Sequence, residues 1–173
     1  MHLQIKKQIT VNTPAVKAWQ ILAHEFAAIS HWASMIPASA ALADPSAPTT
    51  AQVAGRSCAG PGFGQIEEKF TAYDEAAMRF TYAATAGLPA FFKRAQNTWS
   101  VQALGEKQCL VGAHADVELT LLPGLFVLPF VHLYLQRITA HTTEELKYYL
   151  EHGQPHPRKR KAQQPGRRTA VHT

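Results

Sequence analysis

Residues 64–84, GQIEEKFTAYDEAAMRFTYAA, carry the pattern from which the rest of the expected architecture follows. They predict two alternating strands joined by a turn at Asp74 and Glu75. Successive side chains of a strand point to opposite faces, so every second residue shares one inner face. That face holds Ile66, Glu68, Phe70 and Ala72 from the first strand and Met78, Phe80, Tyr82 and Ala84 from the second. Because Glu68 is its one charged member, the hairpin predicts a container for an apolar molecule with a carboxylate on the inner wall.

The chain before this hairpin predicts a strand followed by a helix. Residues 3–11 alternate between apolar and polar, with a slip near Lys7 that predicts a β-bulge. Residues 12–14, Asn-Thr-Pro, predict a helix start, because a capping side chain is followed by proline in the first turn. We expect the helix to cover residues 15–23 and to bury Val16 among its inward side chains.

Several shorter segments complete the expected order of elements. We expect a second short helix at 25–30, edge strands at 38–43, 49–54 and 56–59, and longer strands at 96–103 and 108–120. The strand at 108–120 has the clearest alternation, which favours a sheet with one apolar face.

The C-terminal part predicts one long helix and a tail. Residues 121–129 look like an apolar connector, and residues 131–151 have the spacing of an amphipathic helix that ends at Gly153. The stripe facing the sheet includes Leu135 and Ile138. Residues 154–173 are rich in Pro, Gln, Lys and Arg and are expected to form a basic, disordered tail outside a domain of residues 1–153.

The net charge of +5 belongs to this tail rather than to the domain. From residue 157 onward there are six Lys or Arg and no Asp or Glu, which leaves 11 basic against 12 acidic residues before it. A body near neutrality does not favour a nucleic-acid partner. The two cysteines fit no metal or redox motif, and no signal segment is recognisable, so we expect a reduced, cytoplasmic protein.

The order of these elements and several short motifs resemble the SRPBCC or START-like superfamily, which includes polyketide cyclases/dehydrases and lipid transport proteins. The motifs are Pro14-x-x-x-x-Trp19, Ile29-x-x-Trp32, Glu68-x-Phe70-Thr71-Ala72-x-Asp74, Arg79-Phe80-Thr81-Tyr82 and Leu88-Pro89. The resemblance covers about residues 1–151. It implies an α+β helix-grip fold, in which a curved antiparallel sheet surrounds a long C-terminal helix and two short helices lie between the first two strands. It also implies an internal cavity, used by different members for binding, transport or catalysis.

The inner faces of the expected strands and helix provide the candidate ligand-binding residues. Ala113 stands where the resemblance implies an inward aromatic residue, so we expect it to enlarge the cavity. The full candidate set is Trp32, Glu68, Phe70, Met78, Phe80, Tyr82, Asn97, Trp99, Ala113, Leu135 and Ile138. An unpaired buried carboxylate is costly. Glu68 is therefore expected to bind a polar group of the ligand, to pair with Arg56 or Arg94, to act as an acid/base catalyst, or to lie at a solvated rim.

Three functions remain open at this point. The first is binding or transport of a small hydrophobic ligand such as a lipid, polyketide or aromatic compound. The second is a cyclase or dehydratase-like reaction that uses Glu68, and the third is contact with a membrane or protein through residues 121–131 and the basic tail. A homodimer is a further option. We expect no cofactor and no metal site, because no two histidines within the expected helix of residues 131–151 have the i, i+4 spacing of a helical zinc site.

Overall fold

The computed structural model of the chain describes residues 1–42, 51, 53–60 and 64–164, and of 122–125 the backbone alone. The elements are strand β1 (His2–Val11), helix α1 (Ala15–Trp19), π-helix η1 (Gln20–His24), 3₁₀-helix η2 (Phe26–His31), strands β2 (Ser39–Leu42), β3 (Gly55–Gly60), β4 (Gly64–Asp74), β5 (Arg79–Ala86), β6 (Phe92–Gly105) and β7 (Gln108–Leu119), and helices α2 (Leu121–His152) and α3 (Pro157–Gln163).

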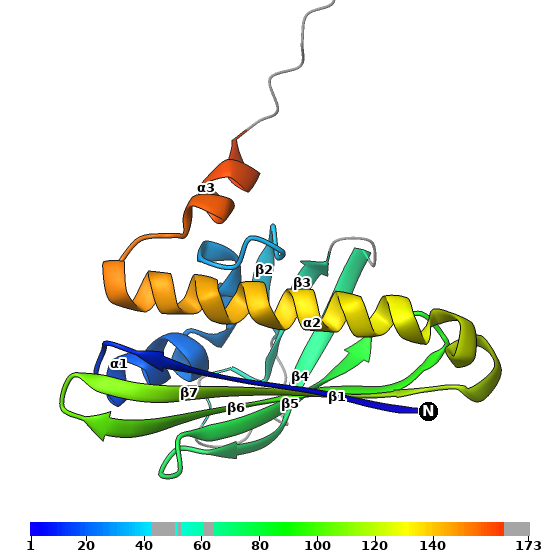
Figure 1. Cartoon of the computed structure of the whole chain (residues 1–173), viewed down its shortest axis with the longest axis horizontal. Coiled ribbons are helices and arrows are strands. Elements are labelled where there is room, and N and C mark those ends of the chain that lie inside the picture. The colour runs from blue at the N-terminus through cyan, green and yellow to red at the C-terminus, as the bar shows by residue number, and fades with distance from the viewer. Residues whose placement is uncertain (43–50, 52, 61–63, 165–173) are drawn as a thin grey trace, which may run out of the picture.

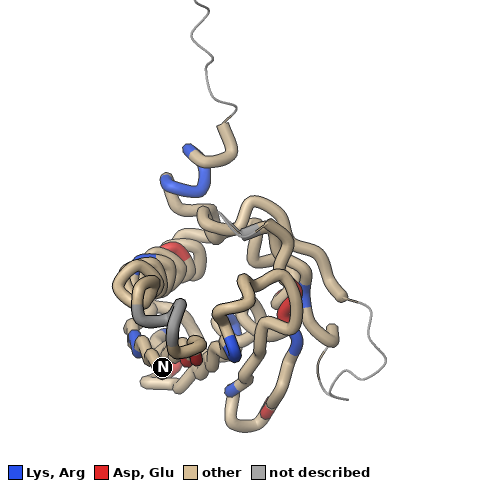
Figure 2. The backbone as a smooth tube through the Cα atoms, turned by 90° about the vertical axis from the view of Figure 1, so that its right-hand side faces the viewer, with Lys and Arg blue, Asp and Glu red and all other residues tan. Residues whose placement is uncertain are grey.

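The strands form one antiparallel sheet in the order β1-β7-β6-β5-β4-β3-β2. Figure 1 shows α2 lying across one face of this sheet, with α1 and the short helices beside one end. Figure 2 views the molecule from the right-hand side of Figure 1 and shows the curvature of the sheet. The arrangement confirms the expected α+β fold, in which an antiparallel sheet curves around a long C-terminal helix.

The hairpin of β4 and β5 has the expected inner face, with one change. A register shift between Phe70 and Ala72 lets Phe70 pair with Tyr82 while Ala72 pairs with Thr81. The extra residue reverses the alternation, as a β-bulge does. Ala72 is therefore exposed, contrary to prediction, and Tyr73 packs against the core in its place.

The turn of this hairpin is fastened to the N-terminal helices by Glu75. Its carboxylate accepts hydrogen bonds from the indole N–H of Trp19 at 2.8 Å and the hydroxyl of Tyr73 at 2.8 Å, and it lies 2.9 Å from Nε2 of His24. Burial acts to raise the pKa of Glu75, but these hydrogen bonds outweigh it and lower the pKa below its ordinary value. Trp19 thus anchors the helices to the sheet.

Three expectations for the N-terminal region are wrong. The pairing of β1 with β7 runs in continuous register from His2 to Val11, so the bulge predicted near Lys7 is absent from this described strand. Pro14 is itself the N-cap of α1, which has no side-chain cap hydrogen bond. Val16 is 69% exposed rather than buried, because Ala15, Ala18 and Trp19 form the inward face of the short helix.

The strands β2 and β3 differ in length from the predicted ones, since β2 is shorter and β3 is longer. β2 and β3 confirm the strands predicted at 38–43 and 56–59. Of the strand predicted at 49–54, the described residues 51, 53 and 54 form bends, and the others lie outside the described residues. In contrast, β7 buries every second residue from Cys109 to Leu119, as its alternation predicts.

Helix α2 begins ten residues earlier than the sequence pattern predicts. The expected connector at 121–129 is the first part of the helix, in spite of Pro123 and Pro129. Pro123 lies in the first turn, where the backbone N–H of a helix has no partner in any case, so proline is tolerated there. The C-terminal end is as predicted, since Gly153 adopts a left-handed conformation with φ of 68° and donates its N–H to Tyr149.

We expected residues 154–173 to be disordered, but part of this tail is helical. Residues 157–163 form α3, whose N-cap His156 accepts a hydrogen bond from the backbone N–H of Arg158. The helix is fixed by Lys159, which is 1% exposed and donates from Nζ to the carbonyl of Ile36 at 3.0 Å. This contact supplies the order that composition alone does not predict. The division into a domain of residues 1–153 and a tail stays a prediction.

Buried apolar side chains gather in two clusters along α2. The larger cluster surrounds Trp19, Phe26 and Phe80 and receives Leu146 from the C-terminal part of the helix. The smaller cluster contains Val117, Leu119 and Val131. The middle of α2 lies between the two clusters and borders the site described below.

Candidate functional site

A cavity of about 180 Å³ lies between the inner face of the sheet and the middle of α2. Its wall is mostly apolar. The residues that form it are Ile29, Ile36, Arg56, Ile66, Glu68, Tyr82, Ala84, Leu88, Phe92, Ala95, Gln96, Asn97, Trp99, Ala115, Val117, Tyr134, Leu135, Ile138, Thr139 and Thr142. An apolar pocket with few polar groups is typical of sites for small molecules.

Small residues on the sheet leave this space empty. Ala84, Ala95 and Ala115 lie on three adjacent strands where the wall faces α2. A methyl side chain reaches less far than a valine or leucine, so the helix and sheet do not meet at this level. The residue expected to enlarge the cavity, Ala113, instead packs in the larger core at 3% exposure. Ala115, two residues further along β7, has that position.

The polar part of the wall is built around an ion pair between adjacent strands. Arg56 on β3 and Glu68 on β4 are direct register partners, which places both side chains on the same face. Nε of Arg56 donates to Oε2 of Glu68 at 2.6 Å. The Arg56 side chain is 4% exposed and that of Glu68 is 19% exposed. Of the partners considered from sequence, Arg56 is the one found, and Arg94 pairs with Asp116 instead.

Arg56 has further contacts that hold its guanidinium in place. Nη1 donates to the carbonyl of Phe26 at 3.0 Å, and the guanidinium carbon lies 4.0 Å from the ring centre of Phe26 and 5.1 Å from that of Tyr82. Burial acts to lower the pKa of Arg56, but the Glu68 carboxylate outweighs it, and the pKa is raised above its ordinary value. Arg56 therefore stays charged inside the protein.

Burial keeps the neighbouring groups neutral. It raises the pKa of Tyr82 to about 12, with a further contribution from the charge of Glu68. Burial also raises the pKa of the Cys58 thiol to about 11, although the charge of Arg56 acts to lower it. The carboxylate of Glu68, whose Oε2 lies 3.8 Å from the thiol, raises this pKa further. A thiol with a raised pKa is a weaker nucleophile at neutral pH than an ordinary cysteine.

Asn97 adds a polar group that the described residues do not fully satisfy. Its Nδ2 donates to the hydroxyl of Tyr82 at 3.1 Å, whereas its buried Oδ1 has no hydrogen-bond partner within the described part of the chain. Reversing the amide would only exchange the roles, because one of its two ends would still lack a partner. Buried polar groups without partners are rare and costly, which makes this amide a candidate contact for a bound molecule.

The structure brings six of the eleven candidate residues to the cavity wall. These are Glu68, Tyr82, Asn97, Trp99, Leu135 and Ile138. The other five pack in or against the larger core: Trp32, Phe70, Met78, Phe80 and Ala113. Strand alternation alone does not separate the two groups, since a core and a cavity wall use the same face. Contact of any of these residues with a ligand stays a prediction.

Several wall residues were not expected from the sequence. Thr139 and Thr142 belong to the helix stripe but replace its larger apolar members beside the cavity. Ile29 and Ile36 come from the region of the short helices, and their position depends on contacts remote in sequence. Both threonines stand in a helix stripe whose other members are mostly apolar, and this change of residue type is the signal that could have identified them.

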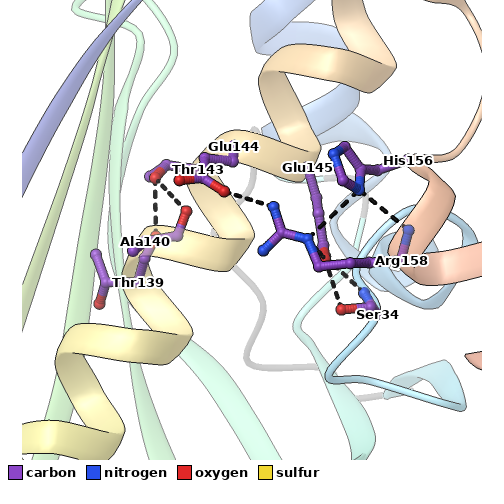
Figure 3. A network of polar contacts seen from close by, with 8 residues as sticks. All are labelled: Ser34, Thr139, Ala140, Thr143, Glu144, Glu145, His156 and Arg158. Carbon is purple, nitrogen blue, oxygen red and sulfur yellow. Dashed lines mark hydrogen bonds and ion pairs between the residues drawn. The ribbon is translucent and has the colours of Figure 1, made fainter.

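A second polar network fixes the segment that contributes Ile36. Glu145 on α2 is fully buried and accepts hydrogen bonds from the backbone N–H of Ser34 at 2.7 Å and from its hydroxyl at 2.6 Å. Nε of Arg158 lies 3.5 Å from the same carboxylate. Figure 3 shows Glu145 pointing from α2 toward Ser34 and Arg158. The burial of Glu145 depends on these partners, which are remote from it in sequence.

The described residues show neither a metal cluster nor a membrane-spanning helix. Among the described residues, no group of three or more His, Cys, Asp or Glu could hold a metal ion. Within the same part of the chain, no helix is long and apolar enough to cross a membrane. To a bound molecule, the cavity wall can offer apolar contact, hydrogen bonds with Tyr82 and Asn97, and the charges of the ion pair between Arg56 and Glu68.

A family model described as polyketide cyclase/dehydrase and lipid transport matches residues 2–151. The comparison with curated proteins gives no match. The fold is similar to that of a START superfamily protein from Mycobacterium smegmatis, with 20% identity, 87% of this chain and 98% of that chain covered, and a TM-score of 0.69.

Two enzymes also have similar structures. An aromatase/cyclase from Streptomyces has 10% identity and a TM-score of 0.70, with 90% of this chain and 100% of that chain covered. Norcoclaurine synthase from Thalictrum, in complex with a transition-state analogue, has 13% identity and a TM-score of 0.66, with 87% and 94% covered. At these identities the likeness establishes the shared fold alone.

Proposed function

Since the chain belongs to the polyketide cyclase/dehydrase and lipid transport family, within the START-like superfamily, we propose that it binds a small hydrophobic ligand in its internal cavity. The observation that carries this proposal is the apolar cavity between α2 and the three alanines of the sheet. A lipid, a polyketide or an aromatic compound has the apolar character that this wall requires. The two cysteines are free and buried, which agrees with the reducing cytoplasm that we propose as its compartment.

The nature of the polar contacts supports binding over catalysis. A general acid or base must exchange a proton with the reacting molecule. Oε2 of Glu68 is instead held by the hydrogen bond from the charged Arg56, which ties the carboxylate to the wall. We therefore assign Glu68 to ligand recognition rather than to the acid/base role of a cyclase or dehydratase.

The test is binding of N-phenyl-1-naphthylamine, a neutral probe whose fluorescence rises in apolar surroundings. We expect saturable binding by the wild type and its loss in Ala115→Leu, because the larger side chain fills the cavity. Ala103→Leu is the matched control, since Ala103 is exposed on β6. Equal binding by wild type and Ala115→Leu, with both folded, would place the probe elsewhere and overturn the proposal. Mass spectrometry of ligands retained from a cell extract would then identify the natural compound.

Peripheral membrane contact is a second candidate, favoured by the outer surface of α2. Phe126, Phe130 and Leu133 are 76%, 75% and 66% exposed, and they recur at helical spacing. No charged residue occurs between Glu118 and Arg137. We expect the full chain to float with liposomes of neutral phospholipid and Phe126→Gln/Phe130→Gln to remain in the dense fraction. Failure of the full chain to float removes this candidate without affecting the cavity proposal.

A further inference from the structure

The cavity wall has a charge arrangement that bears on which ligands it accepts. Arg56 and Glu68 are its only charged residues among the described part of the chain. They neutralise each other through the 2.6 Å contact between Nε and Oε2. A ligand that enters therefore meets one cation whose carboxylate partner is already in place.

Glu68 is not the only group that positions Arg56. The guanidinium also donates to the carbonyl of Phe26 and lies against the rings of Phe26 and Tyr82. The carbonyl and the two rings do not depend on the side chain at position 68. Without a carboxylate there, the guanidinium would keep these contacts and stay on the wall as an unpaired cation.

We propose that Glu68 sets the charge selectivity of the cavity by masking Arg56, so that the wild type accepts uncharged ligands and rejects carboxylates. This inference rests on the proposed binding function and deepens it. A ligand carboxylate beside Arg56 would also lie beside Glu68, and two like charges repel strongly in a site that contains little water. An alcohol of the same chain length brings no charge and can hydrogen-bond to the polar groups of the wall.

The experiment compares 1-decanol with decanoate as competitors of N-phenyl-1-naphthylamine at pH 8, where decanoate is ionised. We expect decanol to displace the probe from the wild type with an affinity at least about tenfold higher than that of decanoate. In Glu68→Gln, the amide keeps the size of the side chain but removes its charge. We expect the affinity for decanoate to rise by about tenfold or more while that for decanol changes little.

Glu67→Gln is the matched control. It removes the same charge from the adjacent position of β4, and Glu67 is not part of the cavity wall. We expect its selectivity to equal that of the wild type. An equal gain of decanoate affinity in Glu67→Gln and Glu68→Gln would assign the effect to overall charge and overturn the proposal.

A double variant, Arg56→Met/Glu68→Met, tests the role of the cation separately, because it removes both charges together and leaves neither unpaired. We expect it to bind decanol and to discriminate against decanoate, since no cation remains. If this variant or the wild type bound both compounds comparably, the proposed selectivity role of Glu68 would be overturned, and the proposed ligand binding would stand. If the wild type binds the probe but neither compound displaces it, the selectivity proposal is overturned. If the wild type does not bind the probe, the proposed function is overturned as well.

Discussion

The two halves of α2 use the same helix for different purposes. Residues 137–152 carry charged side chains that tie the helix to the scaffold: Lys147 donates to the carbonyl of Thr10, and Glu151 accepts from the backbone N–H of Asn12. Residues 121–136 carry no charge, and they expose Phe126 and Phe130 while packing Val131 in the smaller core. Residues 137–152 therefore anchor the helix to the rest of the protein. Residues 121–136, which we call the apolar cover, lie beside the cavity. Stability should therefore depend mainly on the C-terminal half.

The largest expected effect is the loss of a core contact in that half. Leu146 is fully buried, so Leu146→Ala should lower the free energy of unfolding by about 2–5 kcal/mol through lost apolar contact and a new void. Leu133→Ala makes the same truncation in the other half, where the side chain is 66% exposed, and should change stability by no more than about 0.5 kcal/mol. Urea unfolding measures both. Similar losses would contradict the division of α2 into an anchored and a free half.

The next effect concerns the buried carboxylate of Glu145. Glu145→Ala leaves the N–H and hydroxyl of Ser34 without their acceptor, and we expect a loss of about 1–3 kcal/mol. Glu144→Ala is the control on the adjacent position, because its ion pair with Arg158 is exposed and should contribute at most about 1 kcal/mol. Thermal unfolding of both variants compares them. A loss in Glu144→Ala as large as that in Glu145→Ala would show that the exposed pair fastens α3.

A smaller effect is expected from pH at Glu144. Its hydrogen bond from Arg158 lowers the pKa of this carboxyl below its ordinary value of 4.5. A lowered pKa in the folded state means that the unfolded state binds more protons in this range, so stability is present above pH 4.5 and is lost as the pH falls through the folded pKa. The wild type should exceed Glu144→Gln in melting temperature at pH 7, and the difference should shrink below pH 4.5. A constant difference would exclude this ionisation as its source.

The smallest change in stability is expected on the apolar cover. Phe126→Gln/Phe130→Gln should leave the free energy of unfolding within about 0.5 kcal/mol of the wild type for each substitution, since both rings are largely exposed. Retention on a hydrophobic column should fall, because apolar surface is removed. A cooperative loss of structure at ordinary temperature would mean that these rings belong to the core after all.

The sequence was most informative where local pattern and tertiary role agree. The alternation of β7 and the inner face of β5 are local properties, and both were predicted correctly. The reversal at Ala72 could not be predicted from alternation, because a bulge shifts the register without changing the apolar pattern that precedes it. Residues 121–129 were assigned to a connector because their prolines and glycine resemble a break, whereas packing against the smaller core stabilises a helix there.

The candidate site was predictable in kind but not in detail. A carboxylate at Glu68 within an apolar set indicated a polar feature on the inner wall, and pairing with Arg56 was among the options. The choice between Arg56 and Arg94 depends on which strand lies beside β4, which is a long-range property. For the same reason the pattern did not distinguish Ala115 from Ala113, since both face inward and only the position of α2 determines which one meets the cavity.

The ends of the sheet bear on how copies of the protein behave at high concentration. Sheet edges offer unpaired backbone groups to which another chain can add a strand. Here one edge strand, β2, has only four residues, and on the other, β1, Lys147 takes up the carbonyl of Thr10. The short β2 offers a template of only four residues, and the contact from Lys147 blocks pairing at one position of β1, so both features act against growth of the sheet from molecule to molecule.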